Sequence, residues 1–301
     1  MKQKLVVVLG PTAVGKTKFA VQLAHQFNGE IISADSRQVY RGMTIGTGKD
    51  LDEYKINNLS IPYHLIDVVN PSEEYNLYQF KKDFKNSFDI IAEKGKNPFL
   101  VGGTGLYIHS LLMNYNLNTV NFDSPRNKFL SALSDDELLE ILSNLNPQLH
   151  NTTDTLNRDR MIKAILIAEG ETTQDKNTLE MIPFVIGIRE ERQIIKDRIT
   201  TRLKSRLKNG MIEEIEKLIS DGISFDKLDF FGLEYRFIGK YLQGELTYND
   251  MYQKLNSAIH KFAKRQMTWF RKMEREGIDI SWLNFNELEK GKTLVAKYLK
   301  K

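Results

Sequence analysis

A glycine-rich loop that directly follows a buried strand constrains this chain more than any other feature. Residues 5–9, Leu-Val-Val-Val-Leu, form an apolar run rich in β-branched side chains, typical of a parallel strand covered on both faces. The next residues match G-x-x-x-x-G-K-[ST], and they are Gly10, Pro11, Thr12, Ala13, Val14, Gly15, Lys16 and Thr17. An amphipathic helix is expected at 18–27. Strand, loop and helix together predict a site where backbone N–H groups and a helix N-terminus bind phosphate.

Two side chains of this loop add chemistry to the backbone. Lys16 supplies a positive charge, and Thr17 supplies a hydroxyl suited to holding Mg²⁺. The motif leaves the ligand open, because any diphosphate fits it as well as a nucleoside triphosphate does. An NTPase usually also has an apolar strand ending in a metal-binding acid, and Asp35 and Asp67 match that requirement only loosely.

Strand-like and helical patterns alternate along the first third of the chain and resume near residue 183. We expect strands at 31–34, 63–68, 99–103 and 183–188, and helices at 77–92 and 104–113. This alternation predicts an α/β fold, a P-loop NTPase-like parallel sheet with right-handed crossovers and flanking helices. The C-terminal part is expected to be helical, at 190–209, 211–221, 232–242 and 247–275. A weaker ending starts at Trp282, and the Lys-rich tail 297–301 is expected to fray.

The stretch from 118 to 180 differs in composition from the rest. Asn, Ser, Thr and Asp crowd 114–124 and 150–159, and helical patterns lie at 126–145 and 160–169. We interpret 118–180 as a small, mostly helical insertion domain. Residues 1–117 and 181–301 then form the catalytic core with its C-terminal helices.

Composition excludes several classes of protein. With 41% hydrophobic residues among 301, the chain can bury a real core, which excludes global disorder. The absence of cysteine excludes disulfides, thiolate metal sites and a cysteine nucleophile, and the five histidines lack metal-ligand spacing. No segment approaches the ~20 apolar residues of a membrane helix, and the N-terminus does not resemble a signal peptide. We therefore expect a cytoplasmic protein without a membrane partner. The net charge of +4 leaves a nucleic-acid partner undecided.

Two polar segments follow expected strands, at the sheet edge where open α/β folds bind ligands. Asp35 ends the second strand and leads into Ser36, Arg37 and Gln38, which offer a general base and polar groups able to read a base edge. Thr104 lies in a Gly-Gly-Thr-Gly turn and can direct its hydroxyl into the same cleft. A purely structural interpretation is equally open for each segment, because Asp35, Ser36 and Thr104 are all good helix N-caps.

Two helices carry basic stripes. Arg198, Arg202 and Arg206 recur every four residues, which fits either a solvated face or a clamp on phosphate. The segment 251–273 contains no acid, and its basic residues are Lys254, Lys261, Lys264, Arg265, Arg271 and Lys272. Its packing side is expected to consist of Leu255, Ala258, Phe262 and Trp269. A one-sided basic face predicts contact with a phosphate backbone, the alternative being a solvated surface helix.

Four segments, in this order, closely resemble the bacterial tRNA dimethylallyltransferases. They are GPTAVGKT at 10–17, DSRQVYRGMTIGT at 35–47, LVGGTGLY at 100–107 and AKRQMTWFR at 263–271. The resemblance covers nearly the whole chain. It implies transfer of a dimethylallyl group from dimethylallyl diphosphate to N6 of adenosine 37, beside the tRNA anticodon.

The resemblance also implies residue roles. Asp35 is the general base on the adenine N6, Thr104 assists catalysis, and the loop 10–17 holds the diphosphate with Mg²⁺. Arg198 and Arg202 match arginines near the leaving group. The implied tRNA contacts, together with those of the basic helix, are Asp35, Ser36, Arg37, Gln38, Arg126, Asp159, Arg160, Met161, Ile162, Lys163, Lys264, Arg265 and Arg271.

The chain departs from the family pattern at two places. Lys163 stands where Arg is usual, and Lys does not make the bidentate contact that Arg makes. Residues 232–236, Gly-Leu-Glu-Tyr-Arg, replace a Gly-Tyr-Arg-Gln type of motif and carry no implied role.

Two other functions compete with prenyl transfer. A P-loop kinase for a small molecule would not need so large a basic helix. A non-catalytic RNA-binding NTPase would leave Asp35 and Thr104 without a role. We expect a monomer that acts on the anticodon stem-loop of tRNA.

Overall fold

The structure is a computed structural model of the chain, and it describes residues 3–115, 125–145, 158–169 and 180–300. The chain divides into two compact units. One unit comprises Met1–Met113 and Leu179–Lys301, and the other comprises Asn114–Thr178.

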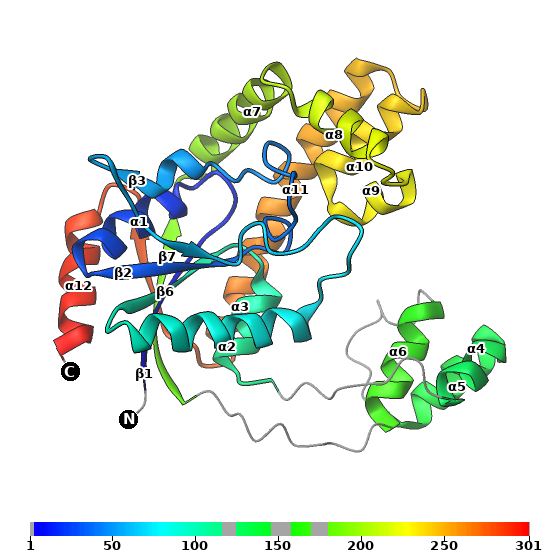
Figure 1. Cartoon of the computed structure of the whole chain (residues 1–301), viewed down its shortest axis with the longest axis horizontal. Helices are drawn as coiled ribbons and strands as arrows, with labels where there is room; N and C mark the ends of the chain where they lie inside the picture. The colour runs from blue at the N-terminus through cyan, green and yellow to red at the C-terminus, as the bar shows by residue number, and fades with distance from the viewer. Residues whose placement is uncertain (1–2, 116–124, 146–157, 170–179, 301) are drawn as a thin grey trace. The chain divides into compact units, whose positions relative to one another are not determined.

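The larger unit is built on a parallel six-stranded sheet with the order β5-β2-β6-β1-β7-β8 (Figure 1). The strands are β1 (Gln3–Leu9), β2 (Gly29–Ala34), β5 (Tyr63–His64), β6 (Asn97–Gly102), β7 (Met181–Arg189) and β8 (Ile280–Asn284). Leu9 lies opposite Gly102 and Gly187, and Ala34 also lies opposite Gly102. The carboxyl ends of four strands therefore meet at one edge, which confirms the predicted parallel α/β fold.

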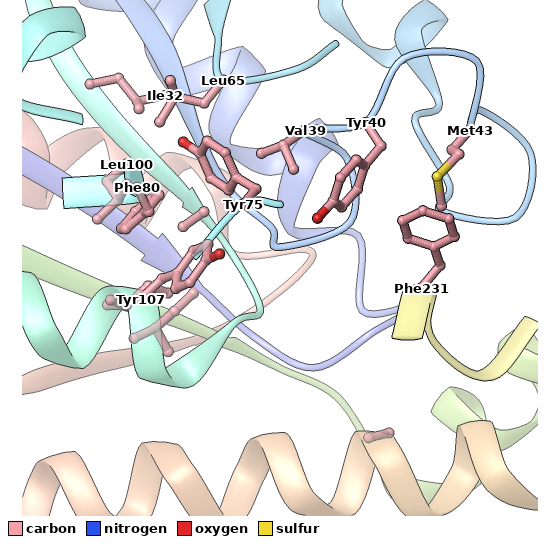
Figure 2. Close-up of a cluster of buried hydrophobic side chains, with 14 of the residues drawn as sticks. Ile32, Val39, Tyr40, Met43, Leu65, Tyr75, Phe80, Leu100, Tyr107 and Phe231 are labelled. Carbon is pink, nitrogen blue, oxygen red and sulfur yellow. The ribbon is translucent and has the colours of Figure 1, made fainter. Parts of the chain in front are cut away.

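Helices cover both faces of the sheet. Alternate residues of a strand point to opposite sides, and in β1 the residues on both sides are apolar, so both faces are buried. Val6 and Val8 face the core formed with α1 (Lys16–Gln26) and α12 (Leu288–Lys300). Leu5, Val7 and Leu9 face the other core, which includes α2 (Leu77–Glu93), α3 (Gly105–Leu112) and α11 (Tyr248–Arg275). Figure 2 shows part of this second core, where Phe80 and Tyr107 stack with ring centroids 4.0 Å apart.

The remaining elements of the larger unit follow β2 and β7. The segment after β2 contains η1 (Leu51–Tyr54) and a small antiparallel pair, β3 (Lys55–Ile56) with β4 (Leu59–Ser60). After β7, the chain forms α7 (Arg192–Lys208), α8 (Met211–Ser220), α9 (Phe225–Phe231) and α10 (Leu233–Leu242) before the long α11. None of the described helices combines the length and apolar run that crossing a bilayer requires.

The smaller unit has its own core, formed by α4 (Pro125–Ala132), α5 (Asp135–Leu145) and α6 (Arg158–Glu169). The single helical pattern expected at 126–145 is wrong, because two helices occupy it. The break falls at Ser134, whose N–H donates to the Glu137 carboxylate at 2.7 Å, while Glu137 N–H donates to Ser134 Oγ at 3.4 Å. This reciprocal pair is a capping box, which begins a new helix.

Three further expectations about elements are wrong. The strand expected at 63–68 ends at His64, because Leu65 and Asp67 have φ of 62° and 55°, outside the extended region. The weak ending contains β8 and α12, and Lys297 lies within α12 instead of a frayed tail. Leu5 N–H donates to the Tyr298 hydroxyl at 2.9 Å, which ties this last helix to the first strand.

The packing side of α11 also differs from the expected one. Phe262 is 39% exposed. The buried residues are Met251, Leu255, Ile259, Ala263, Gln266, Phe270 and Met273. Their spacing of three and four residues shows that the stripe includes a polar side chain, Gln266, which a purely apolar pattern omits.

Candidate active site

The loop at 10–17 turns sharply between β1 and α1. A Cβ on Gly10 would lie 2.7 Å from the carbonyl oxygen of Ile188, so only glycine fits against β7 there. Gly15 has φ of 90° and immediately precedes α1, a backbone conformation that glycine adopts without strain. The loop therefore presents the N-terminus of α1 to the sheet edge, as the motif predicts.

A pocket of about 260 Å³ lies against this loop. It brings together nine of the residues singled out in the sequence: Thr12, Ala13, Gly15, Lys16, Thr17, Asp35, Gln38, Arg198 and Arg202. No site role was predicted for the other lining residues, which are Ser33, Thr47, Gly48, Asp50, Glu53, Tyr54, Val101 and Gly102. Of these, Asp50 and Glu53 add two carboxylates to that of Asp35, and the pocket also holds three cationic side chains, Lys16, Arg198 and Arg202.

Asp35 and Thr104 are held by the same short turn. Asp35 Oδ1 accepts hydrogen bonds from the N–H groups of Arg37 at 2.9 Å and Gln38 at 3.4 Å. Thr104 Oγ1 accepts from Ser36 N–H at 3.1 Å. Both bonds to Asp35 use one carboxylate oxygen, and Oδ2 accepts no hydrogen bond among the described residues. The carboxylate thus combines a fixed orientation with one oxygen available as a proton acceptor.

The helix-cap interpretation is wrong for Asp35 and Ser36, and for Thr104 it is right in position alone. Residues 36–39 form turns and no helix, so Asp35 and Ser36 have no helix to cap. Thr104 does occupy the N-cap position of α3, yet its side chain makes no capping bond within α3. Its hydroxyl is instead committed to Ser36.

Gln38 is tied by both ends of its side-chain amide. Its Oε1 accepts from Ser33 Oγ at 3.2 Å, and its Nε2 donates to the Gly48 carbonyl at 3.0 Å. Arg37 points elsewhere and lies over the Phe230 ring, 4.8 Å from the centroid. Gln38 therefore lines the pocket, whereas Arg37 packs on an aromatic ring outside it.

Three cations surround the position expected for phosphate. Burial lowers the pKa of Lys16 to about 8, although the Asp35 charge acts in the opposite direction. Burial and the nearby Arg206 lower the pKa of Arg202 to about 10. Arg202 donates to the Thr12 hydroxyl, and Arg198 donates to the Val14 carbonyl at 3.4 Å. Desolvated cations without a full set of anionic partners favour binding of an anion.

The loop after Tyr40 is held by a carboxylate that the sequence analysis missed. Glu214 accepts hydrogen bonds from the N–H groups of Thr44, Ile45 and Gly46 at 2.8, 2.7 and 3.0 Å. It also accepts from the Tyr235 hydroxyl at 2.8 Å. Tyr235 belongs to the segment 232–236 that had no implied role.

A partly buried ion pair secures the other end of the same loop. The Lys49 ammonium lies 2.5 Å from Asp67 Oδ1 and also donates to the Tyr40 carbonyl. Asp67 is therefore a structural partner of Lys49 and does not line the pocket with Asp35. Together with Glu214, this pair fixes the loop that contributes Thr47, Gly48 and Asp50 to the pocket.

The pocket contains an oxygen donor set that fits Mg²⁺. The Thr17 hydroxyl and the carboxylates of Asp50 and Glu53 line the same space. Burial and the Asp50 charge raise the pKa of Glu53, a repulsion that a divalent cation relieves. Mg²⁺ commonly takes one or two carboxylates together with substrate phosphates and water. The described residues contain no group of three or more His, Cys, Asp or Glu arranged to hold a metal ion.

In the smaller unit, two of the expected tRNA contacts face inward. Met161 and Ile162 belong to its hydrophobic core, so their expected side-chain contact with tRNA is wrong. Arg126 is paired with Glu169 through two hydrogen bonds, at 2.8 and 2.5 Å. Asp159 and Lys163 are exposed, and the side chain of Arg160 lies outside the described residues.

The basic helix borders a groove of about 540 Å³ between α7 and α11. The floor includes the apolar side chains Ile195, Ile199 and Met267. The groove is lined by one acid, Glu190. The basic residues that line it are Arg189, Arg192, Lys196, Lys261, Lys264 and Arg271. Arg265 is exposed and lies over the Phe262 ring, 5.9 Å from the centroid.

Comparisons with known proteins agree on one family. A family model described as IPP transferase matches residues 38–273, and one described as isopentenyl transferase matches residues 3–60. A tRNA dimethylallyltransferase 1 from Geotalea uraniireducens is 54% identical over 284 residues, 94% of this chain and 93% of the relative. A tRNA dimethylallyltransferase 2 from Citrifermentans bemidjiense is 52% identical over 97% of this chain and 95% of its own. The crystal structure of a tRNA isopentenylpyrophosphate transferase from Bacillus halodurans has a TM-score of 0.71 at 34% identity, covering 99% of this chain and 97% of that one.

Proposed function

The chain belongs to the IPP transferase family, and from this premise we propose that it is a tRNA dimethylallyltransferase. It transfers a dimethylallyl group from dimethylallyl diphosphate to N6 of adenosine 37, giving N6-dimethylallyladenosine and diphosphate. One observation supports this assignment most strongly: Asp35 and a cationic phosphate cradle line the same pocket.

The leaving group is a diphosphate, so negative charge grows on its oxygens as the allylic C–O bond breaks. Lys16, Arg198 and Arg202 line the pocket and stabilise that charge, together with the backbone N–H groups at the start of α1. The burial that lowers the pKa values of Lys16 and Arg202 also places both side chains in a medium of low dielectric, where a charged side chain attracts an anion more strongly than it does at the surface.

The nucleophile is the exocyclic amine of adenine, whose electron pair forms the new N–C bond. An aromatic amine is a weak nucleophile, so loss of its proton must accompany attack. Asp35 accepts this proton on Oδ2, while the turn holds Oδ1. Thr104 supports the geometry because its bond to Ser36 fixes the residue that follows Asp35. The adenine must first leave its stack, which costs a few kcal/mol and less in a loop than in a duplex.

We further infer that Mg²⁺ accompanies the diphosphate, held by Thr17 with Asp50 and Glu53. When bound, Mg²⁺ neutralises part of the charge on the diphosphate oxygens. The chain's own cations remain necessary, because they orient the diphosphate relative to Asp35.

For tRNA, we propose that the basic groove between α7 and α11 contacts the phosphate backbone. Its excess of Lys and Arg over a single acid supports this role. The insertion domain, expected at 118–180, contributes a further contact surface through Asp159 and Lys163, which are exposed. A monomeric state remains a prediction. A cytoplasmic location remains a prediction.

One assay separates this function from a P-loop kinase. The protein is incubated with unmodified tRNA and labelled dimethylallyl diphosphate, and in parallel with tRNA or nucleosides and γ-labelled ATP. We expect label from the prenyl donor to appear in tRNA at adenosine 37, and none from ATP. Transfer of the γ-phosphate without prenyl transfer would support the kinase instead.

A further inference from the structure

A glutamine on the long helix α11 connects two loops of the active site. Gln266 is 6% exposed and lies on the buried stripe of the helix. Its Oε1 accepts a hydrogen bond from Thr12 N–H in the phosphate-binding loop at 2.8 Å. Its Nε2 donates to the Gly103 carbonyl, beside Thr104, at 2.9 Å. One side chain therefore spans the loop that binds the leaving group and the loop that carries Thr104.

Helix α11 packs tightly against the loop that carries Thr104. A Cβ on Gly103 would lie 2.4 Å from Gln266 Nε2, and a Cβ on Gly105 would lie 2.7 Å from Trp269 Cβ. Both residues that flank Thr104 are thus pressed against this helix. Consequently the position of Thr104 depends on α11 as well as on β6.

The phosphate-binding loop connects Gln266 to the pocket. Thr12, whose N–H donates to Gln266, also accepts a hydrogen bond from Arg202 through its hydroxyl. Arg202 lines the pocket beside Lys16. A shift of the Gln266 amide would therefore displace a backbone N–H of the phosphate loop and an arginine together.

The chemistry of this position requires an amide. Glutamine offers both an acceptor and a donor at the end of one side chain, whereas an ionised carboxylate only accepts and a thioether does neither well. The neighbouring residues Lys264 and Arg265 are exposed and basic, so one helical turn carries both a buried bridge and a cationic surface.

We propose that Gln266 is a positioning residue, which sets the diphosphate loop against the Thr104 loop from the helix that also contacts tRNA. This inference rests on the proposed function. It predicts that the two faces of α11 act on different substrates, the buried face on the diphosphate and the exposed face on the RNA.

The test compares Gln266→Met with Gln253→Met, a matched change at an exposed position of the same helix. Binding of inorganic diphosphate with Mg²⁺ is measured by calorimetry, tRNA binding by filter retention, and kcat and KM by prenyl transfer. We expect Gln266→Met to weaken diphosphate binding and lower kcat/KM for dimethylallyl diphosphate by about 10- to 100-fold, because small displacements of binding groups have such effects. The tRNA affinity should stay within about twofold, and Gln253→Met should resemble the parent in every assay.

A second variant, Gln266→Glu, supplies a readout that a general packing role would not move. When protonated, the glutamic acid can accept from Thr12 N–H and donate to the Gly103 carbonyl, as glutamine does. Its kcat/KM relative to the parent should therefore rise as the pH falls. This variant also keeps the inference testable where Gln266→Met fails to fold.

Two results would overturn the inference: diphosphate binding by folded Gln266→Met within about twofold of the parent, or a pH-independent ratio for Gln266→Glu. Failure of the proposed function is distinguishable from both. In that case the parent would transfer no prenyl group, while the diphosphate-binding comparison would still report on Gln266.

Discussion

The hydroxyl of Thr104 accepts a hydrogen bond from the backbone N–H of Ser36, at 3.1 Å, across two neighbouring strand ends of the sheet. Ser36 follows Asp35 directly, so this bond connects the expected base to the start of α3. A second bond, from Thr104 N–H to the Ala34 carbonyl at 3.2 Å, closes the connection on the other side of Asp35. The orientation of Asp35 thus depends on a residue about 70 positions away in the sequence.

Thr104→Val should lower kcat while leaving the fold intact. Valine has nearly the same shape but no acceptor, so the Ser36 N–H loses its partner beside Asp35. We expect a fall in kcat of about 10- to 100-fold, because the Asp35 carboxylate is no longer held in its orientation. Thr104→Ser keeps the hydroxyl and should stay close to the parent. Equal activities of the Val and Ser variants in steady-state prenyl transfer would contradict this role.

Asp35→Asn should abolish most turnover without affecting stability. The amide oxygen can still accept from the N–H groups of Arg37 and Gln38, so the turn survives, but the side chain cannot take the proton. General-base help is typically worth 10²–10⁴-fold, and kcat should fall by about that range. Raising the pH should not restore it. A melting temperature equal to the parent's excludes unfolding, and activity within about threefold of the parent would reject Asp35 as the base.

Lys16 makes diphosphate binding sensitive to pH. Burial places its pKa near 8 in the free protein, so above that pH the side chain is neutral and must take up a proton when the anion binds. Affinity should therefore fall as the pH rises through about 8, approaching about tenfold per pH unit well above it. Below about pH 7, Lys16 is already protonated, and its contribution is independent of pH.

Calorimetry with inorganic diphosphate, in buffers of different ionisation enthalpy, measures this proton uptake directly. Lys16→Arg is the matched control, because its guanidinium stays charged and any remaining pH dependence belongs to the ligand. If the affinity for diphosphate depended on pH equally in the parent and in Lys16→Arg, Lys16 would not be the source of the pH dependence. Lys16→Ala should bind tRNA normally and transfer no measurable prenyl group.

The exposed face of α11 should control the salt dependence of tRNA binding. Replacing Lys264 and Arg271 with alanine removes two cations that line the groove between α7 and α11. The slope of log K against log salt should flatten by roughly 0.7–0.9 for each RNA phosphate that the variant no longer neutralises. Affinity for dimethylallyl diphosphate should barely change. Lys297→Ala, on the exposed side of α12, is the control, and a slope as steep as the parent's in the double variant would show that this face is only solvated.

Glu214→Gln should loosen the loop at 44–46. The carboxylate accepts four hydrogen bonds there, whereas the NH₂ group of glutamine would face N–H donors and leave them unpaired. We expect a loss of about 1–3 kcal/mol in unfolding free energy, measured in urea, and a raised KM for dimethylallyl diphosphate. Glu213→Gln changes the neighbouring, exposed carboxylate and should do neither. A stable variant with an unchanged KM would argue against this anchor.

Features with local causes could be predicted from the sequence. The loop at 10–17 needs only glycines and a lysine at fixed spacing between a strand and a helix, and both its conformation and its place in the pocket agree with that pattern. The parallel sheet follows from alternating strands and helices, and the order of four family-like segments identified the family. Arg198 and Arg202 were found because a spacing of four residues places them on one face of α7.

Features that depend on partners distant in the sequence could not be predicted from it. Glu214 carries no local pattern that separates it from surface residues. Gln266 lies in the family-like segment 263–271, but the resemblance assigned no role to it. The roles of both arise because α8 and α11 bring them to loops distant in the sequence. Asp50 and Glu53 reach the pocket only because the loop before them is anchored at both ends. Met161 and Ile162 look like part of a contact motif in the chain, but the packing of α6 against α4 and α5 buries them. Local spacing sets dihedral preferences and helix faces, whereas burial and hydrogen bonding across elements are properties of the assembled chain.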